Sequence, residues 1–263
     1  MKIATWNVNS IRSRLGHVCQ WLDASPVDIL CLQETKVIDP DFPRAALEAL
    51  GYQVYIFGQK SYNGVALLSR LPLEPVALGF AAVLGDEATD LDDQKRVISG
   101  KLGELCVVNL YVPNGSEIGS EKYYYKLRWL ATLRDYLKTL LPQQPYLLVC
   151  GDFNVAPEDR DIHNPKGRET HIMSSDAERQ ALRQSILDLG LIDIFRQFNS
   201  EPGQFSWWDY RTAAFNRNSG WRIDHHYLSP ALSQKAKSCV IDRTPRGWEK
   251  PSDHTPVIVE LEL

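Results

Sequence analysis

The sequence of 263 residues has no long apolar run, and none of its apolar stretches approaches the roughly 20 residues that a membrane-spanning helix needs. We therefore expect no association with a membrane. The chain has only five cysteines, odd in number and widely spaced, which argues against a disulfide framework or a zinc site. Such thiols are typical of a reducing compartment. Because the N-terminus reads directly as a strand, we expect no signal peptide and a cytoplasmic location.

An excess of basic residues is also missing. The chain has 29 Lys and Arg against 33 Asp and Glu, a net charge of −4, which argues against bulk non-specific binding of nucleic acid. The charge is uneven, however. Residues 205–222 contain Arg211, Arg217 and Arg222 against Asp209 alone, whereas residues 86–93 form an acidic run. A surface polarised in this way can still present a positive face to phosphate.

No internal repeat, low-complexity segment or linker divides the chain, so we expect a single domain over residues 1–263. Apolar patterns predict strands at 2–8, 28–34, 52–58, 64–69, 96–102, 105–112, 146–151, 204–208, 222–228, 236–242 and 255–262. Helices are predicted near 11–23, 41–50, 120–141, 176–189 and 192–198, and an irregular loop at 71–94. Strands and helices mixed through both halves predict an α/β fold of two packed sheets with helices outside.

The most informative stretch is an apolar run at residues 147–150 that stops at Gly151, Asp152 and Asn154. The short run before a glycine favours a buried strand. Since strand side chains alternate with period two, Asp152 and Asn154 point to the same side. A carboxylate beside an amide can orient a water and an anionic oxygen together. The alternative is an ordinary turn, in which these residue types are common.

Two more strands end in polar pairs. Asn7 and Asn9 end the first strand, and Glu34 and Lys36 follow the second. Carboxylate and amide oxygens are the ligands that Mg²⁺ prefers, with water in the remaining positions. The alternative for Glu34 is a solvated strand end.

Further polar residues lie near other strand ends. Tyr111 and Asn114 offer a phenol and an amide, although a buried tyrosine and a turn asparagine would look the same. Asp224 and His254 supply the parts of a carboxylate–imidazole pair, if the fold brings them together. Such a carboxylate raises the pKa of the histidine and fixes its tautomer.

Taken together, these stretches resemble the exonuclease III class of the endonuclease/exonuclease/phosphatase superfamily, whose members are abasic-site DNA endonucleases. Eight matching stretches occur in family order, at residues 5–9, 32–36, 111–114, 151–154, 164–167, 206–211, 220–224 and 252–254. Each is weak alone, but eight in order are a strong signal. The resemblance implies a DNase I-like fold, a four-layered α/β sandwich of two mixed sheets.

The resemblance also implies a metal site. Its cofactor would be Mg²⁺, with Mn²⁺ expected to substitute, and Glu34 would be the main ligand. The other candidate ligands are Asn7, Asn9, Asp253, Asp152 and Asn154.

Catalytic roles follow from the same resemblance. Asp152 would activate the attacking water, and Asn154 would orient that water or a phosphate oxygen. His254, held by Asp224 or Asp253, would stabilise negative charge on the phosphate. The remaining roles would be phosphate contacts for Tyr111 and Asn114 and protonation of the leaving oxygen by Asp161. Phosphodiester cleavage needs an activated water, a cation on the phosphate and a stabilised leaving oxygen, and this set supplies all three.

The implied substrate is double-stranded DNA with abasic sites or blocked 3′ ends. The enzyme would cleave 5′ to an abasic site and act as a 3′-to-5′ exonuclease that cleans 3′ ends. A base-free sugar is small enough for a snug apolar pocket, and it flips out of the duplex without breaking a base pair. The substrate-binding residues would be Asn114, Lys36, Trp207, Arg211, Trp221 and Ile223, of which Trp207, Trp221 and Ile223 line that pocket.

Two alternative functions share part of this sequence pattern. A phosphoinositide or sphingomyelin phosphodiesterase of the same superfamily would share Glu34, Asp152 and His254, but not the stretches 206–211 and 220–224. This chain also lacks the apolar membrane-docking loop expected of a lipid enzyme. A non-catalytic DNA-binding relative would have lost one of the three shared residues, and none is lost.

Overall fold

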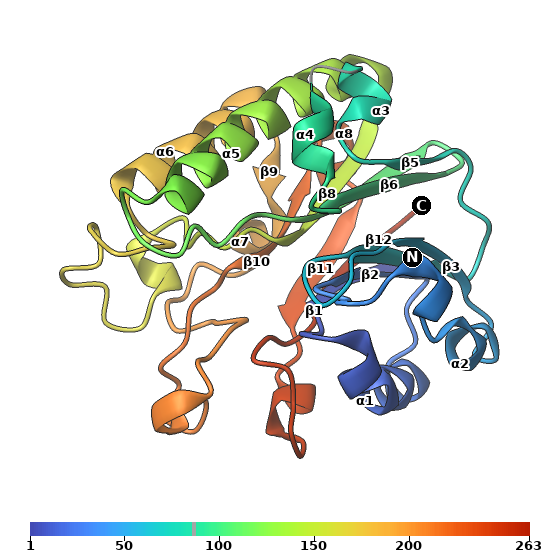
Figure 1. Cartoon of the computed structure of the whole chain (residues 1–263), viewed down its shortest axis with the longest axis horizontal. Coiled ribbons are helices and arrows are strands. Elements are labelled where there is room, and N and C mark those ends of the chain that lie inside the picture. The colour runs from blue at the N-terminus through green and yellow to red at the C-terminus, as the bar shows by residue number, and fades with distance from the viewer. Residues whose placement is uncertain (86–87) are drawn as a thin grey trace.

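The computed structural model describes residues 1–85 and 88–263. Within these residues, two six-stranded β-sheets pack face to face (Figure 1). The strands of the first sheet, in spatial order, are β11 (Ala236–Ile241), β12 (Val257–Leu261), β1 (Lys2–Asn7), β2 (Ile29–Gln33), β4 (Val65–Ser69) and β3 (Gln53–Phe57). In this sheet β1 runs parallel to β2, and the other neighbours are antiparallel.

The second sheet has the same mixed character. Its strands, in spatial order, are β5 (Val76–Leu78), β6 (Val97–Leu102), β7 (Leu105–Tyr111), β8 (Tyr146–Asp152), β10 (Asp224–Leu228) and β9 (Ile192–Asp193). Here β7 runs parallel to β8, and the remaining neighbours are antiparallel. Each sheet therefore contains one parallel pair at its centre.

Helices cover the outer face of each sheet and complete four layers (Figure 1). The first sheet carries α1 (Ile11–Ala24) and α2 (Arg44–Glu48), and the second carries α5 (Glu121–Leu140) and α6 (Asp176–Ser185). Shorter helices are α3 (Ala81–Leu84), α4 (Thr89–Asp92), α7 (Ile194–Phe198) and α8 (Pro230–Ser233). The predicted four-layered α/β sandwich is confirmed. In residues 1–85 and 88–263, no helix combines the length and the apolar character needed to cross a membrane.

Strand periodicity explains why the layers hold together. In β2, Ile29 and Cys31 pack into the core between the two sheets, while Leu30 and Leu32 pack against α1. All four are buried, because the central strands are covered on both faces. The strand β8 alternates in the same way between the inter-sheet core and the layer of α5 and α6.

The register of the central strands brings the polar motifs to one end of the sandwich. Asn7 lies opposite Gln33 in the parallel pair of the first sheet. In the second sheet, Asp152 lies between Tyr111 on one side and Asp224 on the other. The strand ends that carry the polar residues therefore lie next to one another.

One predicted strand is absent. Residues 204–208 form no ladder, and Trp207 makes only isolated bridges to Trp221 and His254 within the described chain. The segment crosses between the two sheets, and the hydroxyl of Ser206 is used by Asp224 rather than by a sheet neighbour. An alternating apolar pattern does not distinguish such a bridge from a strand.

Other boundaries also shift. The predicted loop at 71–94 contains β5, α3 and α4, and the part of it at residues 86–87, with the acidic run there, lies outside the described residues. The predicted helix at 176–189 ends at Ser185, and a short 3₁₀ turn at Leu187–Leu189 follows it. Gly190, with φ of 88°, then ends that turn.

We predict that Gly151→Ala severely destabilises the protein. Gly151 has φ of 145°, and an added Cβ would lie 1.9 Å from the backbone oxygen of Leu110, its partner on β7. The combined strain and overlap should cost about 3 kcal/mol or more of unfolding free energy, measured by urea denaturation. The control is Gly16→Ala on the exposed face of α1, where no atom lies within 4 Å of the added Cβ. This substitution should raise the unfolding free energy by about 0.5–1 kcal/mol. Equal stability of Gly151→Ala and wild type would contradict this account of the β7–β8 pairing.

Candidate active site

Side chains from both sheets converge at this end of the sandwich. Glu34 follows β2, Asp152 ends β8, and His254 precedes β12. One ligand atom from each residue lies within 4.8 Å of the other two. Asp152 and His254 are buried, and Glu34 is partly accessible. Three motifs that are far apart in the sequence therefore form one cluster.

Asn7 holds the two carboxylates of this cluster in place. Its Nδ2 donates to Glu34 Oε1 at 2.8 Å and to Asp152 Oδ2 at 2.9 Å. Its Oδ1 instead accepts a hydrogen bond from the backbone N of Asn9 at 2.9 Å. In this orientation the amide nitrogen faces both carboxylates and positions them. The role of Asn7 as a metal ligand stays a prediction.

His254 forms the expected pair with Asp224. Its Nδ1 lies 2.9 Å from Asp224 Oδ2, which also accepts a hydrogen bond from Ser206 Oγ at 2.7 Å. Burial alone would lower the pKa of His254, but the negative charges of Asp224 and Asp152 raise it to about 10. His254 Nε2 lies 3.7 Å from Asp152 Oδ2. A protonated imidazole in this position is a hydrogen-bond donor and not a metal ligand.

Asp152 is held from its other side by Asn154. The backbone N of Asn154 donates to Asp152 Oδ1 at 2.9 Å, and Asn154 Nδ2 lies 3.2 Å from Asp152 Oδ2. Burial raises the pKa of Asp152; the positive charge of His254 opposes this effect, and the charges of Asp224 and Glu34 add to it. A carboxylate with a raised pKa is a stronger base than a solvated one, which suits proton abstraction from water.

Asn154 also reaches the loop after β7. Its Nδ2 donates to the backbone O of Val112 at 3.0 Å, and its Oδ1 accepts from Asn114 Nδ2 at 3.0 Å. The amide group is thus engaged with protein partners. Asn154 connects Asp152 to Asn114, and a place among the metal ligands is not supported by these contacts.

A second network surrounds Lys36. Lys36 Nζ lies 2.8 Å from Glu34 Oε2 and donates to Asn9 Oδ1 at 2.6 Å. Asn9 Nδ2 donates to Asp253 Oδ1 at 3.0 Å, and Trp207 Nε1 donates to Asp253 Oδ2 at 3.0 Å. Asp253 is not part of the cluster of Glu34, Asp152 and His254. In this structure Asn9 and Asp253 position Lys36 and Trp207, and their role as metal ligands stays a prediction.

Of the predicted ligands, Glu34 and Asp152 fit a divalent metal ion. Both offer carboxylate oxygens, the donor that hard cations prefer. The negative charge of Glu34 contributes to the raised pKa of Asp152, so an added cation between them would relieve the repulsion. Lys36 already partly offsets the charge of Glu34 from the outer side.

Tyr111 and Asn114 lie beside this cluster. Tyr111 is nearly buried, and its pKa is raised well above the usual value by burial and by the charge of Glu34. The phenol therefore keeps its proton and can donate a hydrogen bond. Asn114 is exposed at the start of the following loop. Tyr111 borders the cluster through Glu34, and Asn114 Nδ2 donates to Asn154 Oδ1 beside it.

The predicted apolar pocket is present in part. Trp207, Trp221 and Arg211 line a hollow of about 370 Å³. Ile223, however, is 1% exposed and packs beneath Trp221 in a small apolar cluster that includes Met173. The expectation that Ile223 lines the pocket is therefore wrong, because its side chain lies in the core behind the wall.

Asp161 lies apart from the cluster and does not have the properties of an acid. It is buried against Arg196 and Arg222, with Arg222 Nε at 2.6 Å from Asp161 Oδ1. Burial would raise its pKa, but the two guanidinium groups lower it to about 2. A carboxyl group with this pKa holds no proton to give at neutral pH. The role of Asp161 as the leaving-group acid is corrected to that of a structural ion pair.

One buried ion pair beneath the site is not among the residues predicted from the sequence. Lys126 Nζ contacts Glu178 Oε1 at 2.5 Å and donates to the backbone O of Asn154 at 2.7 Å and of Asn114 at 3.1 Å. It thereby connects α5 and α6 to the two loops that carry these asparagines. A signal was present: Lys126 interrupts an apolar series on α5 whose other members are Tyr123, Leu130, Leu133 and Leu137.

Fold and site together define a hydrolase of the two-sheet α/β sandwich type, with a carboxylate pair, an aspartate–histidine pair and a neighbouring phenol at one edge. The family model of the Endonuclease/Exonuclease/phosphatase family matches residues 4–254. The chain belongs to this family.

Individual relatives are similar over their full length. The chain is 35% identical to the exodeoxyribonuclease III of Haemophilus influenzae, with 100% of both chains covered. The 3′ phosphatase NExo from Neisseria, solved with a product DNA hairpin, has a TM-score of 0.94 and 41% identity, and all of both chains is covered. An AP endonuclease from Archaeoglobus fulgidus has a TM-score of 0.93 and 40% identity, again over both whole chains.

We predict that Asp161→Asn lowers stability rather than chemistry. It removes the partner of two buried guanidinium groups and should cost about 3 kcal/mol or more of unfolding free energy. The exposed control Asp159→Asn should cost less than about 1 kcal/mol. A large loss of turnover at unchanged thermal stability would return Asp161 to the role of an acid.

The same ion pair predicts a pH dependence. Because the folded pKa of Asp161 is about 2 and lies below the unfolded value, its stabilisation is complete above about pH 5 and is lost as the pH falls toward 2. The shift of this pKa corresponds to about 2 kcal/mol of unfolding free energy at neutral pH. Unfolding free energies measured from pH 5 to pH 2 should therefore fall less steeply in Asp161→Asn than in the wild type.

Proposed function

We propose that this protein is a DNA repair nuclease that acts as a 3′-to-5′ exonuclease and cleaves duplex DNA 5′ to abasic sites. The observation that carries the proposal is the assembly of Glu34, Asp152 and His254 within one small cluster. The exodeoxyribonuclease III and AP endonuclease relatives support the same reaction class. The enzyme is a phosphodiester hydrolase, and no feature of the site favours a purely DNA-binding role.

Asp152 is proposed to activate the attacking water. Its carboxylate is buried, has a raised pKa, and is fixed by Asn7 and by the backbone N of Asn154. A base held in this way loses little freedom when it accepts a proton. Asn154 orients the carboxylate of Asp152 and the side chain of Asn114, in addition to the attacking water.

The cofactor is proposed to be Mg²⁺, with Mn²⁺ able to replace it. Glu34 and Asp152 would hold it, with Asn7 keeping their oxygens in position. When bound, such an ion polarises the phosphate and offsets its developing negative charge. The hard oxygen donors of the cluster match the preference of both cations.

His254 and Tyr111 are proposed to stabilise the phosphate. The protonated His254 can donate from Nε2, while Asp224 holds the opposite ring nitrogen. Tyr111 can donate from its neutral hydroxyl, and Asn114 lies beside it. Donors fixed before the reaction stabilise developing negative charge without reorganisation.

The substrate is proposed to be double-stranded DNA that contains abasic sites or blocked 3′ ends. Trp207 and Trp221 form walls of a hollow close to the cluster, since Trp207 bonds to Asp253 next to His254. Lys36 and Arg211 are the cations nearby; in this structure Lys36 pairs with Glu34 and Arg211 with Asp209, and a phosphate would compete for them. The hollow is suited to a base-free sugar, and the charges to the flanking phosphates.

Two broader features belong to the proposal. We infer that residues 1–263 act as one domain, because the core between the sheets takes residues from both of them. We also infer a cytoplasmic location, which is supported by five cysteines that form no disulfide.

We predict that Glu34→Gln abolishes most of the activity and weakens the apparent affinity for Mg²⁺. The substitution keeps the shape and the hydrogen bond to Asn7 but removes the charge that a hard cation needs. Nicking of an abasic duplex, titrated with Mg²⁺, measures both effects. Glu104→Gln, on the exposed turn before β7 at the opposite end of the sheet, is the control. Wild-type turnover with an unchanged Mg²⁺ dependence in Glu34→Gln would refute the metal assignment.

Asp152→Asn separates catalysis from binding. An amide cannot accept the proton of water, so the single-turnover rate should fall by about 10²–10⁴-fold. Equilibrium binding of DNA should persist or tighten, because a negative charge near phosphate is removed. If binding and rate instead fell in equal proportion, Asp152 would have a structural role.

A further inference from the structure

Lys126 on α5 and Glu178 on α6 form an ion pair where these two helices pack side by side over the second sheet (Figure 1). Both side chains are 0% exposed. The ammonium of Lys126 has three donors, and they reach Glu178, the backbone O of Asn154 and the backbone O of Asn114. The pair is therefore bonded to chain segments that lie outside both helices.

Glu178 makes further bonds to the segment that precedes α6. Its Oε1 accepts a hydrogen bond from the backbone N of Met173 at 3.1 Å. Its Oε2 accepts from the backbone N of Ser175 at 3.1 Å and from Ser175 Oγ at 2.7 Å. Met173 lines the tryptophan hollow and belongs to residues 171–175, the wall segment. Glu178 thus joins Lys126 to one wall of the hollow.

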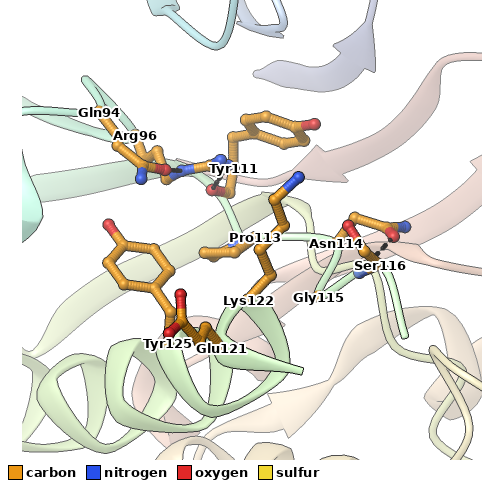
Figure 2. A pocket seen from close by; sticks show the side chains of 10 residues that line it. All are labelled: Gln94, Arg96, Tyr111, Pro113, Asn114, Gly115, Ser116, Glu121, Lys122 and Tyr125. Carbon is orange, nitrogen blue, oxygen red and sulfur yellow. Dashed lines mark hydrogen bonds between the residues drawn. The ribbon is translucent and has the colours of Figure 1, made fainter. Parts of the chain in front are cut away.

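The two backbone oxygens at the ammonium belong to the catalytic side of the site. Asn154 lies within residues 152–156, the cleavage loop, where its backbone N donates to Asp152 Oδ1 at 2.9 Å. Asn114 lies in the loop after β7, where its Oδ1 accepts from the backbone N of Ser116 at 3.1 Å (Figure 2). Asn114 Nδ2 in turn donates to Asn154 Oδ1 at 3.0 Å. One ammonium therefore holds the loops of both Asp152 and Asn114.

Two of the bonded residues have backbone conformations that residues other than glycine rarely adopt. Asn154 has φ of 49° and Met173 has φ of 69°, both in the left-handed region. Such conformations persist only where the surrounding structure determines them. Lys126 bonds to the O of Asn154, and Glu178 bonds to the N of Met173. The pair thus supplies bonds that keep each segment in its strained form.

The cleavage loop and the wall segment also meet directly. Ala156 N donates to Met173 O at 2.7 Å. A hydrogen bond alone permits rotation about itself, so a second point of contact is needed to fix the relative orientation of the two segments. The ion pair adds that second connection, from the O of Asn154 through both buried side chains to the N of Met173.

Stability alone does not account for this arrangement. A buried ion pair can often be replaced by apolar residues of similar volume without loss, because the cost of desolvation offsets the attraction between the charges. Apolar side chains, however, could not bond to the backbone of three separate segments, as this pair does.

We propose that Lys126 and Glu178 are positioning residues that hold the cleavage loop and the wall segment in one fixed relation. A sugar seated in the tryptophan hollow is then aligned with the carboxylate of Asp152. The proposal rests on the proposed nuclease function, which assigns the hollow to the base-free sugar. Alignment matters because a displacement of about 1 Å can reduce the rate by about 10²-fold. Both residues act through backbone groups and do not touch the substrate.

The test uses Lys126→Met, Glu178→Gln and the double variant that combines them. Each single variant leaves one buried charge without its partner, so it should unfold at a clearly lower urea concentration than the wild type. The double variant removes both charges, and its urea midpoint should lie above those of the single variants. Arg183→Met combined with Asp188→Asn breaks an exposed ion pair at the end of α6 and is the matched control.

Kinetics on an abasic duplex separate positioning from stability. In the folded double variant, the single-turnover cleavage rate with Mg²⁺ should fall by about 10²-fold. Equilibrium binding of the same duplex in EDTA should stay close to that of the wild type, and the control should match the wild type in both measurements. If the pair were merely structural, the rate would recover together with the stability. A wild-type rate in the double variant would therefore overturn the proposal.

Amide hydrogen exchange tests the same relation without any substitution and without activity. In the wild type at rising urea, the N–H group of Asn154 in the cleavage loop should lose protection in the same step as those of Met173 and Ser175 in the wall segment. Separate steps for the two segments would overturn the proposal, even if no variant of the pair folds.

The two measurements also separate this proposal from the proposed function. A wild-type protein whose two segments open in one step, but which does not cut an abasic duplex, would contradict the nuclease function and leave the positioning pair supported. A wild-type protein that cuts the duplex, with an equally active double variant, would overturn the pair and leave the function standing.

Discussion

Carboxylates crowded into a buried space are the constraint on which the rest of this site depends. The negative charges of Asp224 and Glu34 raise the pKa of Asp152. These three carboxylates come from different strands or strand ends and lie in one region. Such crowding is unfavourable unless protons, donors or cations offset it. The amide of Asn7, the protonated ring of His254 and the ammonium of Lys36 each offset part of it. A divalent cation would complete the balance and would at the same time serve the reaction.

The cluster exists only because the two sheets pack in one register. Glu34 and Asn7 come from the first sheet, whereas Asp152 and Asp224 come from the second. Beneath the site, a buried amide pair joins the sheets. Gln33 Nε2 donates to Asn109 Oδ1 at 2.7 Å, and Asn109 Nδ2 donates in turn to the backbone O of Leu32 and of Ala66. Because slippage would leave these buried groups unbonded, the pair fixes the relative position of the sheets. The nuclease site is thus set by the core below it.

Much of this arrangement was predictable from the sequence, for identifiable reasons. Short apolar runs indicated the central strands, and several of the polar residues at their ends are the residues that meet. The sequence cannot show which atom of a side chain faces which neighbour. For example, the amide nitrogen of Asn7 faces both carboxylates, a contact that the sequence does not show.

Other failures have a common cause in long-range contacts. The family resemblance assigned Asp161 the role of leaving-group acid, but in the structure it forms ion pairs with Arg196 and Arg222. Ile223 follows a pocket tryptophan in the chain but points into the core. Residues 204–208 have the pattern of a strand but bridge two segments instead. In each case the deciding partner is distant in the sequence.

The central claim is that a divalent cation binds between Glu34 and Asp152 and acts there on the phosphate. Anomalous diffraction from crystals grown with Mn²⁺ and an uncleaved abasic duplex tests it most directly. We expect an anomalous peak in direct contact with a carboxylate oxygen of Glu34 and with an oxygen of the scissile phosphate. A bound ion elsewhere, with Glu34 paired only to Lys36 and Asn7, would contradict the claim.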